Sequence, residues 1–136
     1  MVPATAKEIF ERYIWSGAIT RNADAVAEMF TEDGVLESPL VPVDGAYPRR
    51  MAGRAEIRAG LVAFYARTAG VERPVLPEAS RYTLHTTADP HVFIAEIDAP
   101  SAGPAGTTTM SLVQIFRLRD GKIALLRDYF APDEVA

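Results

Sequence analysis

The chain has no cysteine, and several other features that would point to particular functions are absent or scarce. Without cysteine, disulfide bonds and thiolate metal sites are excluded. No apolar run reaches the roughly 18 residues that a membrane-spanning helix needs. Charged residues at Lys7, Glu8, Glu11 and Arg12 interrupt the N-terminal segment, so it does not resemble a signal peptide. We therefore expect a cytoplasmic protein with no membrane partner.

Basic residues are outnumbered, 14 against 18 acidic ones, and they are scattered along the chain. Nucleic-acid binding needs a clustered positive surface, so no nucleic-acid partner is expected. Glycine-rich phosphate loops and nucleophile elbows are missing, which argues against nucleotide use and serine-hydrolase chemistry. His85 and His91 are the two histidines, and neither has a carboxylate at metal-ligand spacing. We predict neither a metal site nor a cofactor.

The first half of the chain carries the signals of three helices. Thr5 and Glu8 have the spacing of a capping box, in which each side chain satisfies a free backbone N–H of the other. Asn22 can cap a second helix, which Asp33-Gly34 would end. A third helix is predicted over Ala55–Thr68. The apolar residues at helical spacing are Ile9, Phe10, Tyr13, Ile14, Val26, Met29, Phe30, Ile57, Leu61, Phe64 and Tyr65.

The rest of the chain is typical of strands and turns. A short strand over Val35–Ser38 precedes the segment Pro39–Gly53, which is rich in proline and glycine and is either a lid or binding loop or a disordered segment. Four further strands are predicted at about 80–88, 91–99, 107–119 and 122–130, with a flexible hairpin end over Ala99–Gly106. Asp120-Gly121 is a strong hairpin-turn signal. At 136 residues, the chain is expected to form a single α+β domain over 1–136.

Side-chain alternation gives each later strand two faces. The face expected to line a helix-covered hollow carries Phe93, Ala95, Ile97, Met110, Leu112, Gln114, Phe116 and Leu118. The opposite face carries Val92, Ile94, Val113 and Ile115, which is apolar for a monomer surface. We therefore expect that this second face packs against another subunit, so that the protein is a homodimer.

Short motifs along nearly the whole chain resemble one superfamily. They are Arg12-Tyr13, Met29-Phe30, Glu32-Asp33, Leu36-Glu37-Ser38-Pro39, Gly53-Arg54, Phe116-Arg117 and Asp128-Tyr129-Phe130. Their order is similar to that of the nuclear transport factor 2-like superfamily, which includes ketosteroid isomerase, SnoaL-like polyketide cyclases and the phenazine-biosynthesis A/B proteins. The resemblance implies a cystatin-like cone, in which three N-terminal helices pack into a curved antiparallel sheet around a small-molecule ligand. It does not fix an activity, because this fold hosts many chemistries.

Ketosteroid isomerase has an Asp base and an oxyanion hole made of a Tyr and a protonated Asp. The resemblance places the isomerase Tyr on Tyr13, the base on Ser38 and the protonated Asp on Gln114. Only the tyrosine is kept, so ketosteroid isomerase activity is not expected. Ser38 and Gln114 would orient a ligand or water instead. Alternatively, the ring of Tyr13 is simply part of the core and its hydroxyl has a buried partner.

The phenazine A/B proteins end in a segment similar to Arg127-Asp128-Tyr129-Phe130-Ala131-Pro132, and the resemblance places their functional Glu on Asp128. Alternation agrees, because Leu126 and Phe130 share a face with Asp128. A carboxylate in an apolar wall has a raised pKa and can transfer protons near neutral pH. The alternative is a strand-end Asp that pairs with an arginine at the rim of the sheet.

Two functions follow from these residues. The first is a cofactor-free acid–base enzyme, of isomerase, cyclase, dehydratase or lyase type, acting on a small hydrophobic or aromatic metabolite with Asp128 and Tyr13 as catalytic residues. The second is a non-catalytic dimer that binds a small molecule. In both, the expected ligand-binding residues are Ser38, Gln114, Phe30, Tyr65, Phe93, Leu112, Leu126, Phe130 and His85.

Overall fold

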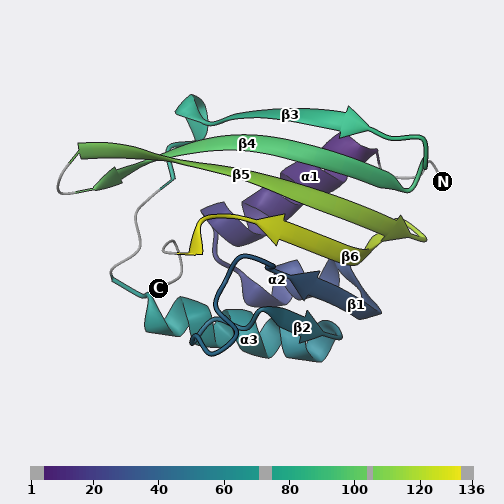
Figure 1. Cartoon of the computed structure of the whole chain (residues 1–136), viewed down its shortest axis with the longest axis horizontal. Coiled ribbons are helices and arrows are strands. Elements are labelled where there is room, and N and C mark those ends of the chain that lie inside the picture. Colours follow the sequence, from purple (N-terminus) through teal and green to yellow (C-terminus); the bar gives the residue numbers. More distant parts are fainter. Residues whose placement is uncertain (1–4, 71–74, 104–105, 133–136) are drawn as a thin grey trace.

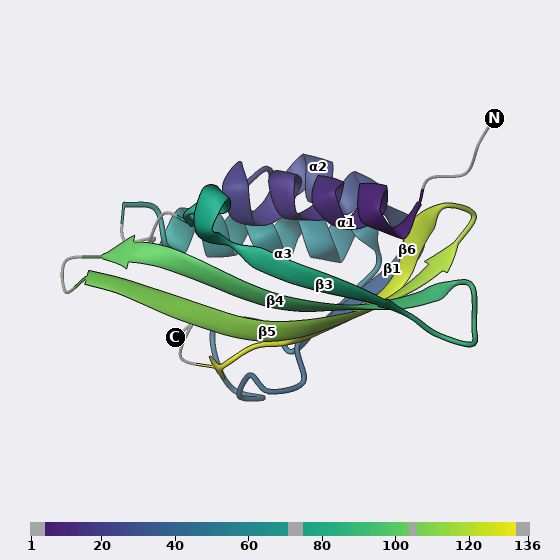
Figure 2. The ribbon, with the colours of Figure 1, turned by 90° about the horizontal axis from the view of Figure 1, so that it is seen from above.

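A layer of helices covers one face of a six-stranded sheet in the computed structural model, which describes residues 5–70, 75–103 and 106–132 (Figures 1 and 2). The helical elements are α1 (Ala6–Ile14), the π-helix η1 (Trp15–Ile19), α2 (Ala23–Glu28), α3 (Arg54–Arg67) and the short 3₁₀-helix η2 (Pro77–Ala79). The strands are β1 (Phe30–Glu37), β2 (Arg50–Ala52), β3 (Arg81–Thr86), β4 (Val92–Gly103), β5 (Gly106–Arg119) and β6 (Lys122–Tyr129). The predicted α+β class is confirmed. The helices of the described residues are too short or too polar to span a bilayer.

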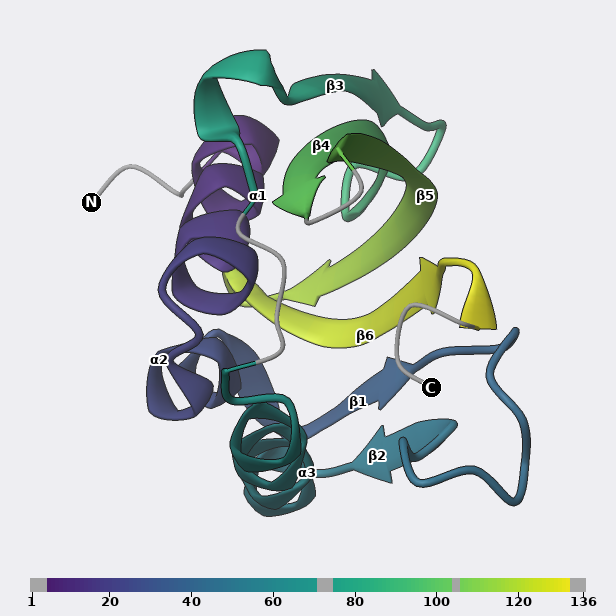
Figure 3. The same cartoon turned by 90° about the vertical axis from the view of Figure 1, so that its left-hand side faces the viewer.

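The sheet has the strand order β2-β1-β6-β5-β4-β3 and curves around the helices, as Figure 3 shows. The pairs β3–β4, β4–β5 and β5–β6 are antiparallel, but β1 pairs with β6 in parallel, with Glu37 opposite Arg127. The prediction of a wholly antiparallel sheet is therefore wrong for this pair. Turn signals report hairpins between neighbouring strands, whereas β1 and β6 are joined by a long crossover that no local pattern reveals.

The helix starts follow the predicted caps. The Thr5 hydroxyl accepts a hydrogen bond from the Glu8 N–H at 3.1 Å, and the Asn22 side chain accepts one from the Ala25 N–H at 3.0 Å. Both N-caps are confirmed, and each satisfies a backbone donor that the first turn leaves free. The reciprocal bond of the predicted capping box, from the Thr5 N–H to the Glu8 side chain, is not found among the described residues. The observed α3, Arg54–Arg67, lies within one residue of the prediction at each end.

The second helix ends earlier than predicted, at Glu28, and Phe30 begins β1 instead of continuing the helix. Gly34 lies inside the strand, where a Cβ atom would be 2.9 Å from the Ile123 carbonyl oxygen of β6. The glycine therefore allows the two backbones to approach closely and does not end a helix. Phe30 is still fully buried, as expected.

Two expected loops contain more strand than predicted. Pairing between β4 and β5 continues to Gly103 opposite Gly106, so the described part of Ala99–Gly106 is a two-stranded arm. The segment Pro39–Gly53 includes β2, which pairs with β1 at the edge of the sheet. In both places backbone pairing with a neighbouring strand overrides small or turn-forming side chains. The Asp120-Gly121 turn is confirmed, with positive φ values of 53° and 77°.

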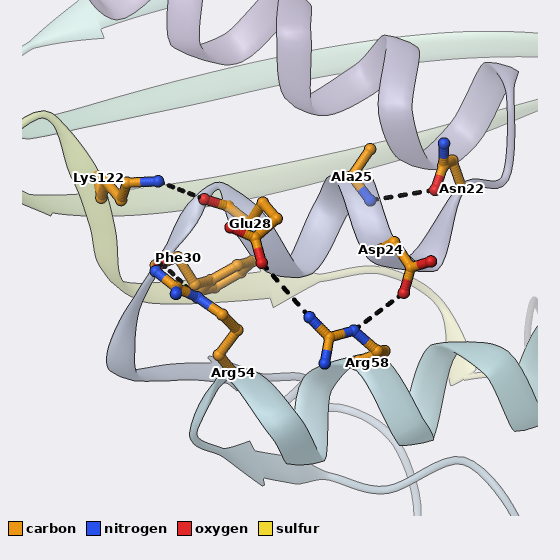
Figure 4. A network of polar contacts seen from close by, with 8 residues as sticks. All are labelled: Asn22, Asp24, Ala25, Glu28, Phe30, Arg54, Arg58 and Lys122. Carbon is orange, nitrogen blue, oxygen red and sulfur yellow. Dashed lines mark hydrogen bonds and ion pairs between the residues drawn. The ribbon is translucent and has the colours of Figure 1, made fainter.

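Polar contacts join the helices to β1 and β6 at the end of the molecule where β6 begins (Figure 4). Arg58 of α3 pairs with Asp24 at 2.9 Å and with Glu28 at 3.4 Å. Arg54 donates to the Phe30 carbonyl oxygen at 2.6 Å, and Lys122 donates to the Glu28 carbonyl oxygen at 2.6 Å. These contacts hold α2 and α3 against the strands at this end of the molecule.

Candidate functional site

Asp128 and Gln114 form a cross-strand pair on the inner face of the sheet. Gln114 of β5 lies directly opposite Asp128 of β6, and its Nε2 donates to the Asp128 Oδ2 atom at 3.3 Å. Asp128 is half-buried as a residue, but its Oδ1 atom is shielded from solvent. The predicted alternative, a pair with a rim arginine, is not found in the described part of the chain. The acid instead faces a neutral amide.

Two tyrosines, Tyr13 and Tyr47, lie near Asp128, and a third, Tyr65, lies near both of them. Tyr13 comes from α1, Tyr47 from the segment that precedes β2, and Tyr65 from α3. The ring of Tyr13 packs edge-on against Phe116 at 5.6 Å between centroids, and that of Tyr47 packs edge-on against Phe64 at 5.1 Å. These edge-to-face contacts hold the rings in place. Tyr13 and Tyr47, from two distant segments, therefore lie close enough to Asp128 for its charge to raise their pKa values.

Burial controls the protonation of these groups. It raises the pKa of Asp128 to about 7, while the hydrogen bond from Gln114 acts in the opposite direction. Burial is also the main cause that raises the pKa of Tyr13, and the nearby Asp128 charge is the second. The pKa of Tyr47 is raised for the same two reasons, and Ser38 and Arg67 oppose the increase. At neutral pH the site thus combines a carboxyl group near its midpoint with neutral hydroxyl donors.

Two oxygen atoms in this region, Gln114 Oε1 and Asp128 Oδ1, are buried without a hydrogen-bond partner in the described residues. A third, Ser38 Oγ, is also buried, and it lies beside the Tyr47 hydroxyl, whose pKa their hydrogen bond lowers. Ser38 directly follows β1, and its N–H donates to the Arg49 carbonyl oxygen at 2.7 Å, which fixes its position. Buried polar atoms normally have a partner, and each that lacks one costs about 1–3 kcal/mol. The cluster therefore has the capacity to bind a polar group of a ligand or an ordered water.

The expected apolar residues share one core with Tyr13. Phe30, Phe93, Leu126 and Phe130 are buried, and Leu112 packs against them while partly exposed. Tyr65 is likewise half-buried against this core. The face assignment of β4, β5 and β6 is therefore confirmed, since a one-residue shift would have exchanged the two faces.

The expected placement of His85 at the site is wrong. His85 is exposed on the outer face of the sheet, where its Nε2 contacts the Glu96 carboxylate of β4. Pairing with β4 fixes the register of β3. Leu84 lies opposite Ala95 and faces inward, whereas His85 lies opposite Ile94 of the outer face. Alternation alone does not say which of the two sets of β3 side chains faces inward, so the orientation of His85 depended on the pairing with β4.

Tyr47 is the site residue that sequence reasoning missed. It lies in the expected lid or binding loop, is only 9% exposed, and packs against Phe130 at 6.1 Å between ring centroids. Val41 of the same segment is fully buried. The available signal was an aromatic residue in a stretch otherwise rich in proline and glycine. No periodicity applies in such a segment, so the direction of the side chain was not predictable.

Metal binding has no support in the described ranges, where no group of three His, Cys, Asp or Glu side chains is suitably placed. The side chains of the site themselves offer an acid, an amide and hydroxyl groups. Asp128 can exchange a proton, and the tyrosines can donate hydrogen bonds to an oxygen atom.

Comparisons with known proteins identify a family for this chain. The family profile of the SnoaL-like domain matches residues 10–126. An uncharacterised PhzA/B-like protein of Pseudomonas aeruginosa is 31% identical over a 136-residue alignment, which covers 93% of this chain and 84% of that protein.

Two solved structures have a similar fold. A candidate isomerase from Bacillus subtilis has a TM-score of 0.72 at 22% identity, covering 96% of this chain and 88% of that one. A phenazine biosynthesis-related protein from Pseudomonas aeruginosa has a TM-score of 0.67 at 19% identity, covering 94% and 76%. At such identities they show the fold alone. Together with the profile match and the PhzA/B-like relative, they confirm the predicted resemblance: this chain belongs to the SnoaL-like family.

Proposed function

We propose that this protein is a cofactor-free acid–base enzyme whose substrate is a small hydrophobic or aromatic metabolite. The observation that carries the proposal is the buried carboxyl group of Asp128, with a pKa raised to about 7, among aromatic side chains. A group that titrates near neutral pH can accept a proton and return it in the same catalytic cycle. Perturbed carboxyl groups of this kind are common in active sites.

In the proposed reaction, ionised Asp128 takes a proton from a carbon atom next to a carbonyl group of the substrate. The electron pair of the C–H bond moves to the carbonyl oxygen, and Tyr13 donates a hydrogen bond to the resulting enolate oxygen. In a β,γ-unsaturated substrate this enolate is a dienolate, and Asp128 returns the proton to the γ-carbon while the double bond shifts into conjugation, which is an isomerisation. The same proton given to a leaving hydroxyl group yields a dehydration. Ser38 and Gln114 orient the substrate.

The test is a pH titration of the Asp128 carboxyl carbon by NMR. The expected midpoint is near pH 7, whereas an ordinary Asp titrates near pH 3.9. Asp33 is the internal control, because its pKa is lowered. A midpoint for Asp128 below about pH 5 would contradict the proposal. Native mass spectrometry of protein purified from its own host identifies the compound to be assayed.

The second candidate is a non-catalytic protein that binds the same class of molecule. It is favoured by the neutral residues Ser38 and Gln114 at the positions where the resemblance places the carboxyl groups of ketosteroid isomerase. In that case the bound compound would be recovered unchanged after incubation with the protein. The enzyme predicts its conversion, with loss of conversion in the Asp128→Asn variant.

A further inference from the structure

A groove of about 440 Å³ opens on the helical side of the molecule, outside the buried centre. Its lining residues are Thr20, Arg21, Asn22, Ala23, Asp24, Val62 and Tyr65. Figure 3 shows how the segment between α1 and α2 lies beside the C-terminal half of α3. The groove thus forms where the end of η1, the start of α2 and α3 meet.

Tyr65 connects this groove with the Asp128 centre. Its side chain lines the groove, and its hydroxyl lies 3.8 Å from the position that a Cβ atom would take at Gly17. It is also close enough to Tyr13 and Tyr47 to contribute to their raised pKa values. Tyr65 is therefore shared by the groove and by the group of tyrosines that includes Tyr13 and Tyr47.

Arg21 has a backbone conformation that is unusual for its residue type. Its φ is 51°, in the left-handed region that glycine or asparagine normally occupies after a helix. It follows the π-helix η1, and its N–H donates to the Gly17 carbonyl oxygen at 2.9 Å. Both π-helical turns and left-handed non-glycine residues are associated with functional sites. The presence of arginine against the local preference points to a role for its side chain.

The guanidinium group of Arg21 lies on an aromatic surface at the edge of the groove. Its central carbon is 4.6 Å from the centroid of the Tyr65 ring and 5.9 Å from that of Phe64. One terminal nitrogen donates to the Thr68 hydroxyl at 2.5 Å and to the Tyr65 carbonyl oxygen at 3.2 Å. These contacts fix the plane of the guanidinium group. Its other N–H groups are left for an external acceptor.

No carboxylate of the described residues neutralises Arg21. Asp24 lines the same groove, but it pairs with Arg58 at 2.9 Å (Figure 4). A second cation, Arg67, lies over the Phe64 ring at 5.5 Å from its centroid. Two guanidinium groups therefore flank the aromatic pair of Phe64 and Tyr65. An anion at this place would meet a positive field and fixed donors.

We propose that Arg21 binds an anionic group of the ligand, so that the substrate class is that of aromatic or hydrophobic acids. The carboxylate, or an equivalent oxyanion, accepts hydrogen bonds from Arg21 in the groove. The apolar body extends past Tyr65 toward Asp128. This arrangement keeps the negative charge of the ligand away from the Asp128 carboxyl group. The inference rests on the proposed function, because it assigns the substrate class of the same site.

The experiment compares two fluorescent probes with the same aromatic skeleton, 1-anilinonaphthalene-8-sulfonate and the neutral N-phenyl-1-naphthylamine. The wild type should bind the sulfonate more tightly. Arg21→Asn should weaken sulfonate binding by about tenfold or more and change neutral-probe binding by less than about twofold. Asparagine tolerates the left-handed backbone, so the fold should be kept. Arg50→Asn, which removes the same charge from the outer side of the sheet, is the matched control and should leave both affinities unchanged.

Equal binding of the two probes by the wild type, or an equal loss in Arg21→Asn and Arg50→Asn, would overturn the proposal. If Arg21→Asn does not fold, Arg21→Lys replaces it: the charge is kept but the planar donor set is lost, and the preference for the sulfonate should fall while the neutral probe still binds. Asp128→Asn should keep the preference. The probe preference of the Arg21 variants tests the anion subsite, whereas turnover in Asp128→Asn tests the acid–base function. The two proposals can therefore fail separately.

Discussion

Two aspartates that lie near opposite ends of β6 have opposite environments. Asp33 belongs to the neighbouring strand β1 and lies near the start of β6. It is exposed, accepts a hydrogen bond from the Thr31 hydroxyl at 2.9 Å and pairs with Arg119. The contact with Arg119 is the main cause that lowers the pKa of Asp33. Near the other end, burial raises the pKa of Asp128 to about 7. The comparison shows that surroundings, and not residue type, decide which aspartate can exchange protons at neutral pH.

The two ends also differ in how their polar groups are satisfied. At the Asp33 end, Lys122 and Arg54 donate to backbone carbonyl oxygens at 2.6 Å. At the Asp128 end, oxygens of Gln114 and of Asp128 itself are buried with no partner in the described ranges. Unpaired buried atoms reduce stability. Unpaired oxygen atoms gathered at one end are expected where a ligand supplies the missing partners. The polar groups at the Asp33 end are paired instead and hold the helices against the sheet.

The largest expected effect is on turnover. Asp128→Asn should lower the rate about 10²–10⁴-fold, which is about 3–5 kcal/mol of barrier, because the amide has similar size but transfers no proton. Tyr13→Phe should cost a smaller factor, since one hydrogen-bond donor is lost while Tyr47 remains. Asp33→Asn is the matched control and should keep full turnover. Full activity with a lowered melting temperature in Asp128→Asn would assign Asp128 to structure.

The second prediction concerns the pH dependence of stability. The folded-state pKa of Asp128 is raised from 3.8 to about 7, so the folded state binds more protons between these values. Its contribution is therefore fully present below pH 3.8 and is lost as the pH rises through about 7. The difference corresponds to up to about 4 kcal/mol. In urea unfolding, Asp128→Asn should consequently be more stable than the wild type at pH 8, and this advantage should disappear at pH 4.

Asp33 should show the reverse sign. Its pKa is lowered in the folded state, so its contribution is present above the ordinary value of 3.8 and is lost as the pH falls through the lowered pKa. Asp33→Asn should therefore lose a little stability at neutral pH and none in strong acid. A wild type that gains stability relative to Asp128→Asn between pH 4 and pH 8 would contradict the contrast between the two aspartates.

The smallest expected effect on turnover concerns the outer face of the sheet. Val92, Ile94, Val113 and Ile115 lie there, and Val113 is 36% exposed. We propose that this face forms a homodimer, because such an apolar patch is unfavourable in water. Ile115→Arg should convert the dimer to a monomer in sedimentation at micromolar concentration. Turnover should be largely retained, because the candidate site lies on the inner face of the sheet. A dimer that persists in this variant would exclude this face as the interface.

Local sequence signals determined much of the fold. Thr5 and Asn22 cap helices because a side-chain oxygen needs only a backbone N–H a few residues away. Asp120-Gly121 makes its turn because both residues adopt positive φ. Alternation correctly placed Gln114 and Asp128 on one face, since the period of two holds along any regular strand. Each of these features depends on neighbours within a few residues.

Other features depended on which segments meet. The parallel pairing of β1 with β6 joins residues about 90 positions apart, such as Glu37 and Arg127, which no local pattern reports. His85 takes the outer face because β3 pairs with β4 in one register. Tyr47 points inward from an irregular segment to which no periodicity applies.

The identity of Asp128 as the candidate acid was determined by sequence, through its alternation with Leu126 and Phe130 and through the family resemblance. Its capacity to exchange a proton at neutral pH was decided only by the tertiary structure. Burial raises its pKa, and the side chains near it include Tyr13 of α1 and Tyr47 of the segment before β2. A free energy of solvation is set by what surrounds a group in space, and these surroundings come from residues far apart in the chain.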